Sequence, residues 1–380
     1  MQIPYGRQWI DEEDIKAVVE VLQSDYLTTG PMVREFEDAI CEYTGAKYAV
    51  AFANGTAALH GACYAAGIGV GDEVITTPIT FAASANCVLY QGGTPVFADV
   101  DARTYNIAPE DIERKITEKT KAIIPVHFTG QPCEMERIHA IAKKHNLLVI
   151  EDAAHALGAT YKDKMIGTLS DMTVLSFHPV KHITTGEGGM VLTNDEELYK
   201  KLVLFHTHGI TRNPELLTKN EGGWYYEQLE LGYNYRITDF QCALGISQLK
   251  KLPMFLEKRR EIAAYYNHAF AGVPNLTVPY QSPDGDSAWH LYMICVPAEW
   301  RKRLYDDLRA AGILVNVHYI PVYAHPYYRK HGYAEVCCPN AEAYYNGAIS
   351  LPMYPALSVK EQDYVIDTVK RLLRAYEAER

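Results

Sequence analysis

The sequence predicts a large α/β domain, in which a mainly parallel sheet is sandwiched by helices, and a smaller C-terminal α+β domain. Through the first two-thirds of the 380 residues, short apolar runs alternate with helical stretches. Short, near-continuous apolar runs are typical of strands that are buried on both faces. From about residue 255 the sequence changes to a long helical stretch and a region rich in tyrosine and proline. We therefore expect a large domain over residues 1–255, which includes an N-terminal arm, and a small domain over residues 256–380.

The first helical stretches repeat apolar residues at helical spacing. In DEEDIKAVVEVL these are Ile15, Val18, Val19 and Leu22, and Asp11 is suited to cap the start. REFEDAICEYTG repeats the pattern and ends at a glycine, which suits a helix stop. Each stretch therefore predicts a helix ahead of the first strand.

Apolar runs then alternate with helical stretches such as MERIHAIAKKH. The runs are KYAVAFA, DEVITT, TPVFADV, KAIIPVH, LLVIED, MTVLSF and GMVLT. Strands that alternate with helices predict parallel pairing, because parallel neighbours need a long crossover connection. The small domain opens on the helical stretch MFLEKRREIAAYYNHAF and closes on EQDYVIDTVKRLLRAYEAE, where Ser358 and Glu361 fit a capping box.

Charge and cysteine content restrict the class of protein. The formal net charge is −11 at pH 7, which disfavours nucleic acid and anionic membrane surfaces as main partners. No apolar run reaches the ~18 residues of a membrane span, and the N-terminus lacks the apolar core of a signal peptide. The eight cysteines form no C-x-x-C pair, and most lie in apolar surroundings. We expect a cytoplasmic protein with reduced thiols and with no nucleic-acid or membrane partner.

An Asn-Gly-Thr turn joins the first predicted strand to an alanine-rich helix in YAVAFANGTAALHGACYAAG. Free N–H groups at a helix start attract anions, and Gly55 allows a ligand to approach the backbone closely. Thr56 adds a hydroxyl group. The turn predicts a phosphate site, with a simple capped turn as the alternative.

An acidic residue, Asp152, ends the apolar run of LLVIEDAAHALGA. Open α/β sheets bind ligands at the carboxyl ends of their strands, and a carboxylate buried there needs a cation or strong donors. The alternative is that Asp152 caps the next helix. His155, three residues later, is placed either to share the site or only to cap.

A lysine, Lys181, lies in SFHPVKHITTGEGG, where proline and glycines restrict or bend the loop. Ser176 comes five residues earlier, so one loop can carry both side chains to one ligand. Together with the phosphate turn and Asp152, these residues fit pyridoxal 5′-phosphate (PLP). Its phosphate, ring nitrogen and aldehyde call for a cluster of donors, a carboxylate and a lysine respectively. Taken alone, Lys181 would be interpreted as a surface lysine.

Other ligand motifs are missing or lie in the wrong context. GEGG at 186–189 precedes a strand-like run rather than a helix, so it is not the dinucleotide fingerprint of a nicotinamide oxidoreductase. The phosphate-loop motif and H-E-x-x-H are absent, and the HTH run at 206–208 has no third metal ligand in register. We therefore expect neither a dinucleotide nor a metal.

Six stretches resemble, in order, those of the DegT/StrS-type sugar-nucleotide aminotransferases, which are fold-type-I, PLP-dependent enzymes. They are NGTAAL, TPITFAASANCVLYQGGTPVFADVD, PVHFTGQP, IEDAAHALGA, SFHPVKHITTGEGGM and GYNYRITDFQCALG. The resemblance covers essentially the whole chain. It implies a transaminase that works as a homodimer, with an active site shared between the subunits.

The resemblance also implies roles for single residues. Lys181 is then the catalytic Schiff-base lysine, and Asp152 faces the pyridine nitrogen. Phe81 is the aromatic ring stacked on the cofactor, and His155 is a second ring contact. The implied phosphate contacts are Gly55, Thr56, Ser176 and, from the other subunit, Asn234.

For the substrate, the resemblance places His318 and Tyr319 near the sugar-nucleotide. They lie in VNVHYIPVYAHPYYRKHGY, whose aromatic residues have a structural cluster as their alternative interpretation. Tyr5 is a candidate contact from the N-terminal arm. Arg236 is a candidate for a diphosphate or carboxylate, with an interface ion pair as the alternative.

A narrower resemblance is to the C4 aminotransferases of pseudaminic acid biosynthesis, carried by IPYGRQWIDEEDI, LTTGPMVREFE and SFHPVKHITTGEGG. It implies amino transfer from glutamate to C4 of UDP-4-keto-6-deoxy-N-acetyl-β-L-altrosamine. The alternatives are another nucleotide-linked keto-sugar and, in a different class, a non-catalytic PLP-binding regulator. The dehydratase branch, in which histidine replaces the lysine, is disfavoured by Lys181. His178 and His182 have no assigned role.

Overall fold

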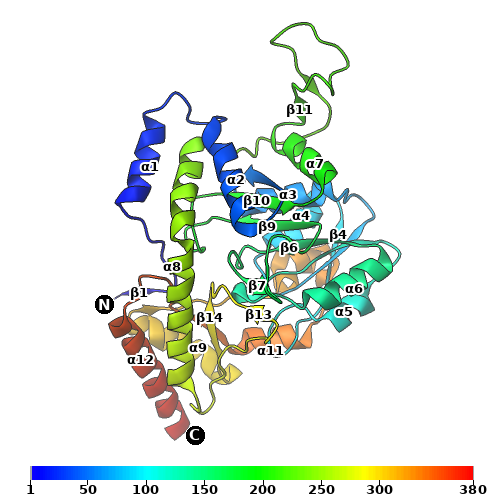
Figure 1. Ribbon diagram of the computed structural model, residues 1–380. Helices are drawn as coiled ribbons and strands as arrows, with labels where there is room; N and C mark the ends of the chain where they lie inside the picture. Colours follow the sequence, from blue (N-terminus) through cyan, green and yellow to red (C-terminus); the bar gives the residue numbers. More distant parts are fainter. Residues whose placement is uncertain (1, 380) are drawn as a thin grey trace.

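The computed structural model describes residues 2–379, and a seven-stranded sheet lies at its centre (Figure 1). The strand order is β2-β10-β9-β6-β5-β3-β4. The bounds are β2 Tyr48–Phe52, β3 Glu73–Thr76, β4 Thr94–Phe97, β5 Thr120–Ile124, β6 Leu148–Asp152, β9 Met172–Ser176 and β10 Gly189–Thr193. All neighbouring pairs are parallel except those that β10 forms with β2 and β9. The predicted mainly parallel sheet is confirmed.

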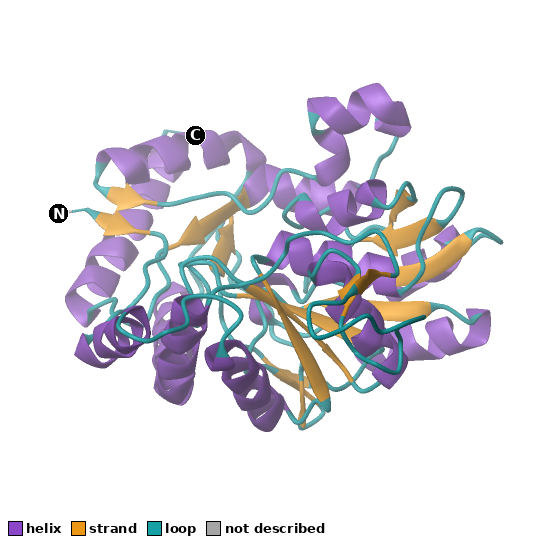
Figure 2. Ribbon diagram, turned by 90° about the horizontal axis from the view of Figure 1, so that it is seen from above, coloured by secondary structure: helices purple, strands orange, loops and turns teal. Residues whose placement is uncertain are grey.

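Helices cover both faces of this sheet, as Figure 2 shows from above. Their bounds are α2 Pro31–Thr44, α3 Gly55–Ala65, α4 Ala83–Tyr90, α5 Pro109–Lys115, α6 Met135–His145, α7 Glu196–His206 and α8 Asp239–Phe270. Helices α3, α4 and α7 pack on one face, and α2, α5, α6 and α8 pack on the other. Along β2, Ala51 points into one core while Val50 and Phe52 point into the other. Because both faces are buried, the strands are apolar along their length.

A second, smaller α+β part follows the sheet. The helices and strands after α8 are β13 Gly285–Asp286, β14 Tyr292–Cys295, α9 Ala298–Ala310, β15 Ile313–Leu314, α10 Pro326–Tyr328, α11 Pro339–Gly347, β16 Ala348–Leu351 and α12 Val359–Ala378. The remaining elements, which lie before α8 in the sequence, are β1 Ile3–Pro4, α1 Glu12–Leu22, β7 Thr160–Tyr161, β8 Lys164–Met165, β11 Ile210–Thr211 and β12 Glu227–Gln228. The core of the smaller part lies between β14, β16, α9, α12 and the end of α8.

The long helix α8 takes part in both cores. Leu252 and Phe255 pack in the core beneath the sheet, whereas Ile262 and Tyr266 pack in the core of the smaller part. The boundary expected at residue 255 therefore falls inside one continuous helix. The division into residues 1–255 and 256–380 stays a prediction.

The N-terminal arm links the two parts. Strand β1 pairs in parallel with β15, and Ile3 is buried in the smaller core. The backbone oxygen of Tyr5 accepts a hydrogen bond from Met353 N, and a side-chain carbon added at Gly6 would lie 3.5 Å from Val180. The arm therefore passes beside the loop that carries Lys181 before it reaches α1.

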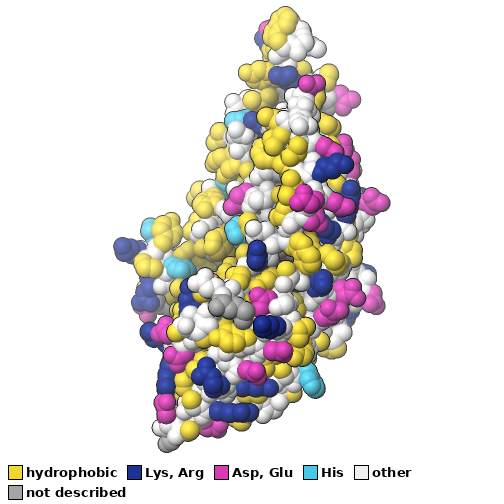
Figure 3. Space-filling view, turned by 90° about the vertical axis from the view of Figure 1, so that its left-hand side faces the viewer, with side chains coloured by type: hydrophobic (Ala, Val, Ile, Leu, Met, Phe, Trp, Pro, Cys, Tyr) yellow, Lys and Arg dark blue, Asp and Glu magenta, His cyan; other side chains and the backbone are white. Residues whose placement is uncertain are grey.

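A hairpin formed by β11 and β12 projects from the body of the molecule (Figure 1). Trp224 and Leu231, in and beside this hairpin, are 73% and 75% exposed. Helix α1 has the predicted cap, Asp11, but Ile15 and Leu22 on its apolar face are about half exposed. Figure 3 faces the α1 side and shows hydrophobic side chains gathered toward the projection. None of the helices within residues 2–379 is long and apolar enough to cross a bilayer.

Helix α1 is fixed to α8 through a buried carboxylate, Asp14. It accepts hydrogen bonds from Ser247 Oγ at 2.7 Å and Gln248 Nε2 at 2.8 Å. Its ion pair with Lys251 Nζ is 2.5 Å long, and its side chain is fully buried. Asp11, the only other partner of Lys251 within residues 2–379, has a side chain that is 38% exposed.

Replacing Asp14 by alanine should lower the free energy of unfolding by about 3 kcal/mol, because the Lys251 ammonium loses its buried partner. The matched control is Asp38→Ala, which breaks an exposed pair with Arg34 and should cost less than about 1 kcal/mol. Urea unfolding of wild type, Asp14→Ala and Asp38→Ala at the same protein concentration measures the difference. Equal losses from the two substitutions would contradict the role given to Asp14.

Candidate active site

The candidate site lies where several strands of the sheet end. Asp152 is the last residue of β6, and Ser176 is the last residue of β9. Strand β2 ends at the same edge and leads through a short turn into α3, which begins at Gly55. The carboxyl edge of an open parallel sheet is where such folds bind ligands, and the predicted residues meet there.

The carboxylate of Asp152 is buried, and each of its oxygens has a donor. Oδ2 accepts a 2.6 Å hydrogen bond from Ser84 Oγ, and Oδ1 accepts one of 3.1 Å from Ala154 N. The backbone of Asp152 is tied to the end of β5, because its N–H donates to Pro125 O and its carbonyl accepts from His127 N. The side chain therefore has a fixed place at the edge of the sheet.

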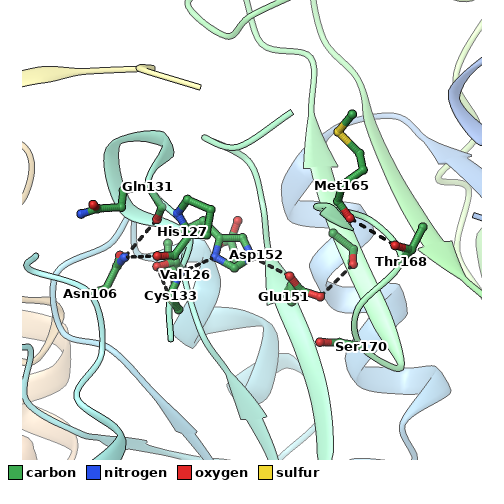
Figure 4. A network of polar contacts seen from close by, with 12 residues as sticks. Asn106, Val126, His127, Gln131, Cys133, Glu151, Asp152, Met165, Thr168 and Ser170 are labelled. Atoms are coloured by element: carbon green, nitrogen blue, oxygen red, sulfur yellow. Dashed lines mark hydrogen bonds and ion pairs between the residues drawn. The ribbon is translucent and has the colours of Figure 1, made fainter. Parts of the chain in front are cut away.

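Glu151, the residue before Asp152 on β6, forms a buried pair with His127 (Figure 4). His127 Nδ1 accepts from Cys133 N at 3.1 Å, so the ring proton is on Nε2, which donates to Glu151 Oε2 at 2.6 Å. Asn106 Nδ2 donates to the carbonyl of Gln131 in the same loop. These bonds fix the loop that follows β5, and sequence reasoning did not single out any of these residues.

Lys181 lies in the loop after β9, where its N–H donates to His178 O. The side chain is partly buried, and its Nζ forms no hydrogen bond or ion pair within residues 2–379. Burial lowers the pKa of Lys181 to about 8, while the Asp152 charge acts in the opposite direction. At slightly alkaline pH a large share of this amine is therefore neutral and nucleophilic.

Donors suited to a phosphate gather at the start of α3. A side-chain carbon added at Gly55 would lie 3.1 Å from Ser176 Cβ, so a larger residue there would press on Ser176. Asn54 caps the helix through Ala57 N, which leaves the amides of Gly55 and Thr56 without an acceptor in the described chain. Amides at a helix start, together with the hydroxyl groups of Thr56 and Ser176, suit a phosphate dianion.

Four histidines lie around Lys181 and stay neutral near pH 7. Burial lowers the pKa of His155, His182 and His290 well below the usual value, and it lowers that of His318 to about 3. His155 Nε2 lies 3.3 Å from the Tyr319 hydroxyl, whereas its buried Nδ1 has no hydrogen-bond partner among residues 2–379. An unpaired buried nitrogen at a site with phosphate donors, a carboxylate and an amine fits PLP, which brings its own polar groups.

The rings of His155 and His290 lie 4.3 Å apart. The loop after β5 makes this possible, because a side-chain carbon at Gly130 would lie within 3.0 Å of Trp289 N, His155 O and His290 N. His182 Nε2 hydrogen-bonds to Ala288 O at 2.9 Å, which ties the Lys181 loop to the same segment. His182 thus has a structural partner. His178 is exposed, and nothing in the structure explains it.

The residues predicted to contact the cofactor ring and the substrate differ in exposure and in the partners they already have. Phe81, at the entrance to α4, is 63% exposed and its ring centroid is 6.4 Å from that of Tyr319. Tyr5 packs on His318 at 5.3 Å. Both ring nitrogens of His318 already face partners in the chain, namely Ser350 Oγ and Asn316 Nδ2.

The two predicted residues near the hairpin, Asn234 and Arg236, are not enclosed by the single chain. Asn234 is exposed in the single chain, and its backbone bridges to Thr207. Arg236 is partly exposed and makes no ion pair within residues 2–379. The neighbouring Tyr235 O accepts from Ala53 N, one residue before the phosphate turn. The contact of Asn234 with a partner's phosphate and the contact of Arg236 with a diphosphate or carboxylate both stay predictions.

Sequence reasoning missed two residues that touch this set. Ser84 lies three residues after Phe81, but a serine among alanines gives no signal of its own. His290 is distant in sequence from every other site residue, so only the fold brings it to His155. No group of three His, Cys, Asp or Glu side chains within residues 2–379 is arranged to hold a metal ion.

The chain matches known proteins along almost its whole length. The profile of the DegT/DnrJ/EryC1/StrS aminotransferase family covers residues 8–370. The spore coat polysaccharide biosynthesis protein SpsC of Bacillus subtilis is 44% identical over 98% of this chain and 97% of its own. The UDP-4-amino-4,6-dideoxy-N-acetyl-β-L-altrosamine transaminase of Campylobacter jejuni is 40% identical over the same shares of both chains.

Solved structures agree with these matches. Helicobacter pylori PseC, an aminotransferase involved in pseudaminic acid biosynthesis, has a TM-score of 0.93 and 36% identity, and the match covers 99% of this chain and 100% of that one. A Streptococcus pneumoniae protein described as a sugar aminotransferase, solved in a PLP form, has a TM-score of 0.92 and 34% identity over 98% of each chain. The predicted fold class and cofactor are confirmed, and the alternative of a non-catalytic regulator is set aside. Sequence, fold and relatives together show that the chain belongs to the DegT/DnrJ/EryC1/StrS aminotransferase family and is a PLP-dependent sugar aminotransferase.

Proposed function

We propose that this protein transfers an amino group from glutamate to C4 of UDP-4-keto-6-deoxy-N-acetyl-β-L-altrosamine, a step of pseudaminic acid biosynthesis. The observation that carries the chemistry is the partly buried Lys181 amine, with its lowered pKa, in the field of Asp152. The choice of sugar is supported by the Campylobacter jejuni transaminase and by Helicobacter pylori PseC. The similarity to SpsC favours a second candidate, amino transfer to another nucleotide-linked keto-sugar.

The proposed division of labour follows the chemistry of each group. When bound, PLP supplies an aldehyde that carries the amino group and a ring that draws electrons from the reacting carbon. Lys181 would hold that aldehyde, and its Nζ, when free, would move a proton at the reacting carbon. The carboxylate of Asp152 holds a proton at the ring nitrogen. Gly55, Thr56 and Ser176 bind the phosphate and keep the ring in register with both side chains.

The substrate side of the site is formed by the N-terminal arm and the segment 316–319. Tyr319 supplies an aromatic surface there, whereas Phe81 and His155 are proposed to contact the cofactor ring. Tyr5 packs beside the same segment, and the loop carrying Lys181 lies against Gly6 of the arm. A sugar held between the arm and Tyr319 would present its keto carbon to the lysine. Arg236 is proposed to meet the diphosphate.

We propose that the working unit is a homodimer. Exposed hydrophobic side chains cluster on the projecting hairpin and the N-terminal helix, and patches of this kind mark interfaces. They include Leu22, Tyr26, Trp224, Tyr226 and Leu231. In such a dimer Asn234 reaches the phosphate of the partner's site, which accounts for its exposure in the single chain.

Replacing Lys181 by methionine should lower amino transfer from glutamate on the order of 10²- to 10⁴-fold, because the amine that moves the proton is gone. Formation of 2-oxoglutarate in the presence of the keto-sugar measures this. Normal turnover in the variant would refute the role of Lys181.

The same variant, freed of cofactor, gives a control for folding and tests the pKa. Below pH 8 the native wild type carries a charged amine at a cost, and above about pH 10.5 the amine is neutral in both states. The methionine variant should therefore melt higher than cofactor-free wild type at pH 7. The gap should shrink as the pH rises from about 8 toward 10.5. A gap that does not depend on pH would contradict the lowered pKa.

A panel of UDP-4-keto sugars that differ at C3 and C5 tests the substrate. We expect glutamate-dependent amination of the β-L-altro sugar, detected by mass spectrometry, with the C4 configuration of the product determined by NMR. Amination of a different nucleotide sugar alone would overturn the pathway and leave the aminotransferase chemistry in place.

Placing charges on the hairpin should separate the subunits. Trp224→Glu combined with Leu231→Glu is expected to halve the mass seen by light scattering and to lower activity. The matched control is Val70→Glu, which changes a 93% exposed side chain away from the hairpin. If the double variant stays dimeric and active, the interface lies elsewhere.

A further inference from the structure

Two buried hydroxyl groups form a chain that ends on Asp152. Thr80 Oγ1 lies 2.7 Å from Ser84 Oγ, and Ser84 Oγ lies 2.6 Å from Asp152 Oδ2. Thr80, Ser84 and Asp152 are 3%, 1% and 4% exposed. A hydroxyl chain so thoroughly excluded from solvent keeps its geometry, because water cannot replace either bond.

The direction of this chain follows from counting protons. A carboxylate only accepts, so the single hydroxyl proton of Ser84 goes to Asp152. Ser84 Oγ must then accept the proton of Thr80. The competing acceptor for Ser84 is Phe81 O, which is farther away at 3.3 Å. The chain therefore runs from Thr80 through Ser84 to the carboxylate.

The same turn of chain carries the aromatic ring predicted to lie on the cofactor. Ser84 N donates to Phe81 O at 3.2 Å, at the start of α4. Ser84 holds one carboxylate oxygen of Asp152, and Ala154 N holds the other. With both oxygens held by donors of the protein, the carboxylate cannot rotate freely, and it keeps lone pairs for a further donor.

We propose that Ser84, oriented by Thr80, is a positioning residue for this enzyme: it fixes the rotation of the Asp152 carboxylate so that it meets the ring nitrogen of the cofactor. This inference rests on the role proposed above for Asp152, but not on the identity of the sugar. One turn, residues 80–84, then carries the aromatic side chain that covers a face of the cofactor ring and also orients the carboxylate that meets the ring nitrogen. A loss of Ser84 acts on the cofactor only through Asp152.

The test measures binding of pyridoxamine 5′-phosphate to cofactor-free protein, since this ligand forms no bond with Lys181. Ser84→Ala should weaken binding about tenfold, the lower end expected for a hydrogen bond to a charged group. Ser84→Thr keeps the hydroxyl and should bind within about twofold of wild type. Thr80→Val should shift the affinity in the same direction by a smaller factor. Unchanged affinity in Ser84→Ala would overturn the proposal.

The matched control is Ser170→Ala, which removes a serine hydroxyl that lies 2.7 Å from His139 Nε2, away from Asp152. Its affinity for the ligand should not change. An equal loss in Ser170→Ala and Ser84→Ala would mean that the ligand senses general loosening of the fold, which would overturn the proposal.

A double-mutant cycle with Asp152→Ala separates positioning from a merely structural role. In the Asp152→Ala background, Ser84→Ala should cost less than about twofold, because Ser84 no longer has a carboxylate to orient. A tenfold loss in both backgrounds would refute the inference. If Asp152→Ala alone binds normally, the proposed role of Asp152 fails. If Asp152→Ala weakens binding while Ser84→Ala does not, only the role of Ser84 fails.

Discussion

The rest of the structure depends on one buried carboxylate at the end of a parallel strand. Burying a charge costs several kcal/mol unless donors or an opposite charge compensate it. Asp152 has both, since Ser84 and Ala154 N donate to it and Lys181 lies in its field. Each of these partners comes from a different connection, so the loops of the sheet must be held in register. The His127–Glu151 pair and the approach at Gly130 hold them.

A second constraint is that the histidine rings around Lys181 carry no charge. The four histidines near Lys181 have pKa values lowered by burial, so their rings add polarity without net charge. A cationic ring there would lower the pKa of Lys181 further and would compete with it for Asp152. Neutral rings leave the lysine and the carboxylate as the pair whose protonation the chemistry uses. Of the two histidines that flank Lys181 in the sequence, His182 belongs to this neutral set and His178 does not.

Much of the fold and part of the site could be predicted from local pattern. The apolar runs around Val50 and Ile150 predicted strands because both faces are buried. Asp152 and Gly55 were found because each stands at or just after the end of such a run, and Lys181 was found because with them it completes a set that fits one cofactor. Contacts between distant segments leave no local trace. Nothing in the alanine-rich stretch around Ser84 indicates a bond to Asp152, and the unbroken course of α8 through both cores hides the expected boundary. The identity of the sugar depends on a few side-chain contacts that no periodic pattern encodes.

The pairing of β1 with β15 has a consequence for how the protein is made. The N-terminal arm is synthesised before the segments that hold it, because its strand pairs with Ile313 and Leu314, and Tyr5 O accepts a hydrogen bond from Met353 N. The sheet and the Lys181 loop can form earlier, because their strands lie closer together in sequence. The nascent enzyme therefore has its catalytic lysine before it has the arm that passes beside it. The arm can dock only after Ile313 and Met353 have been made, so the site stays open on that side until then.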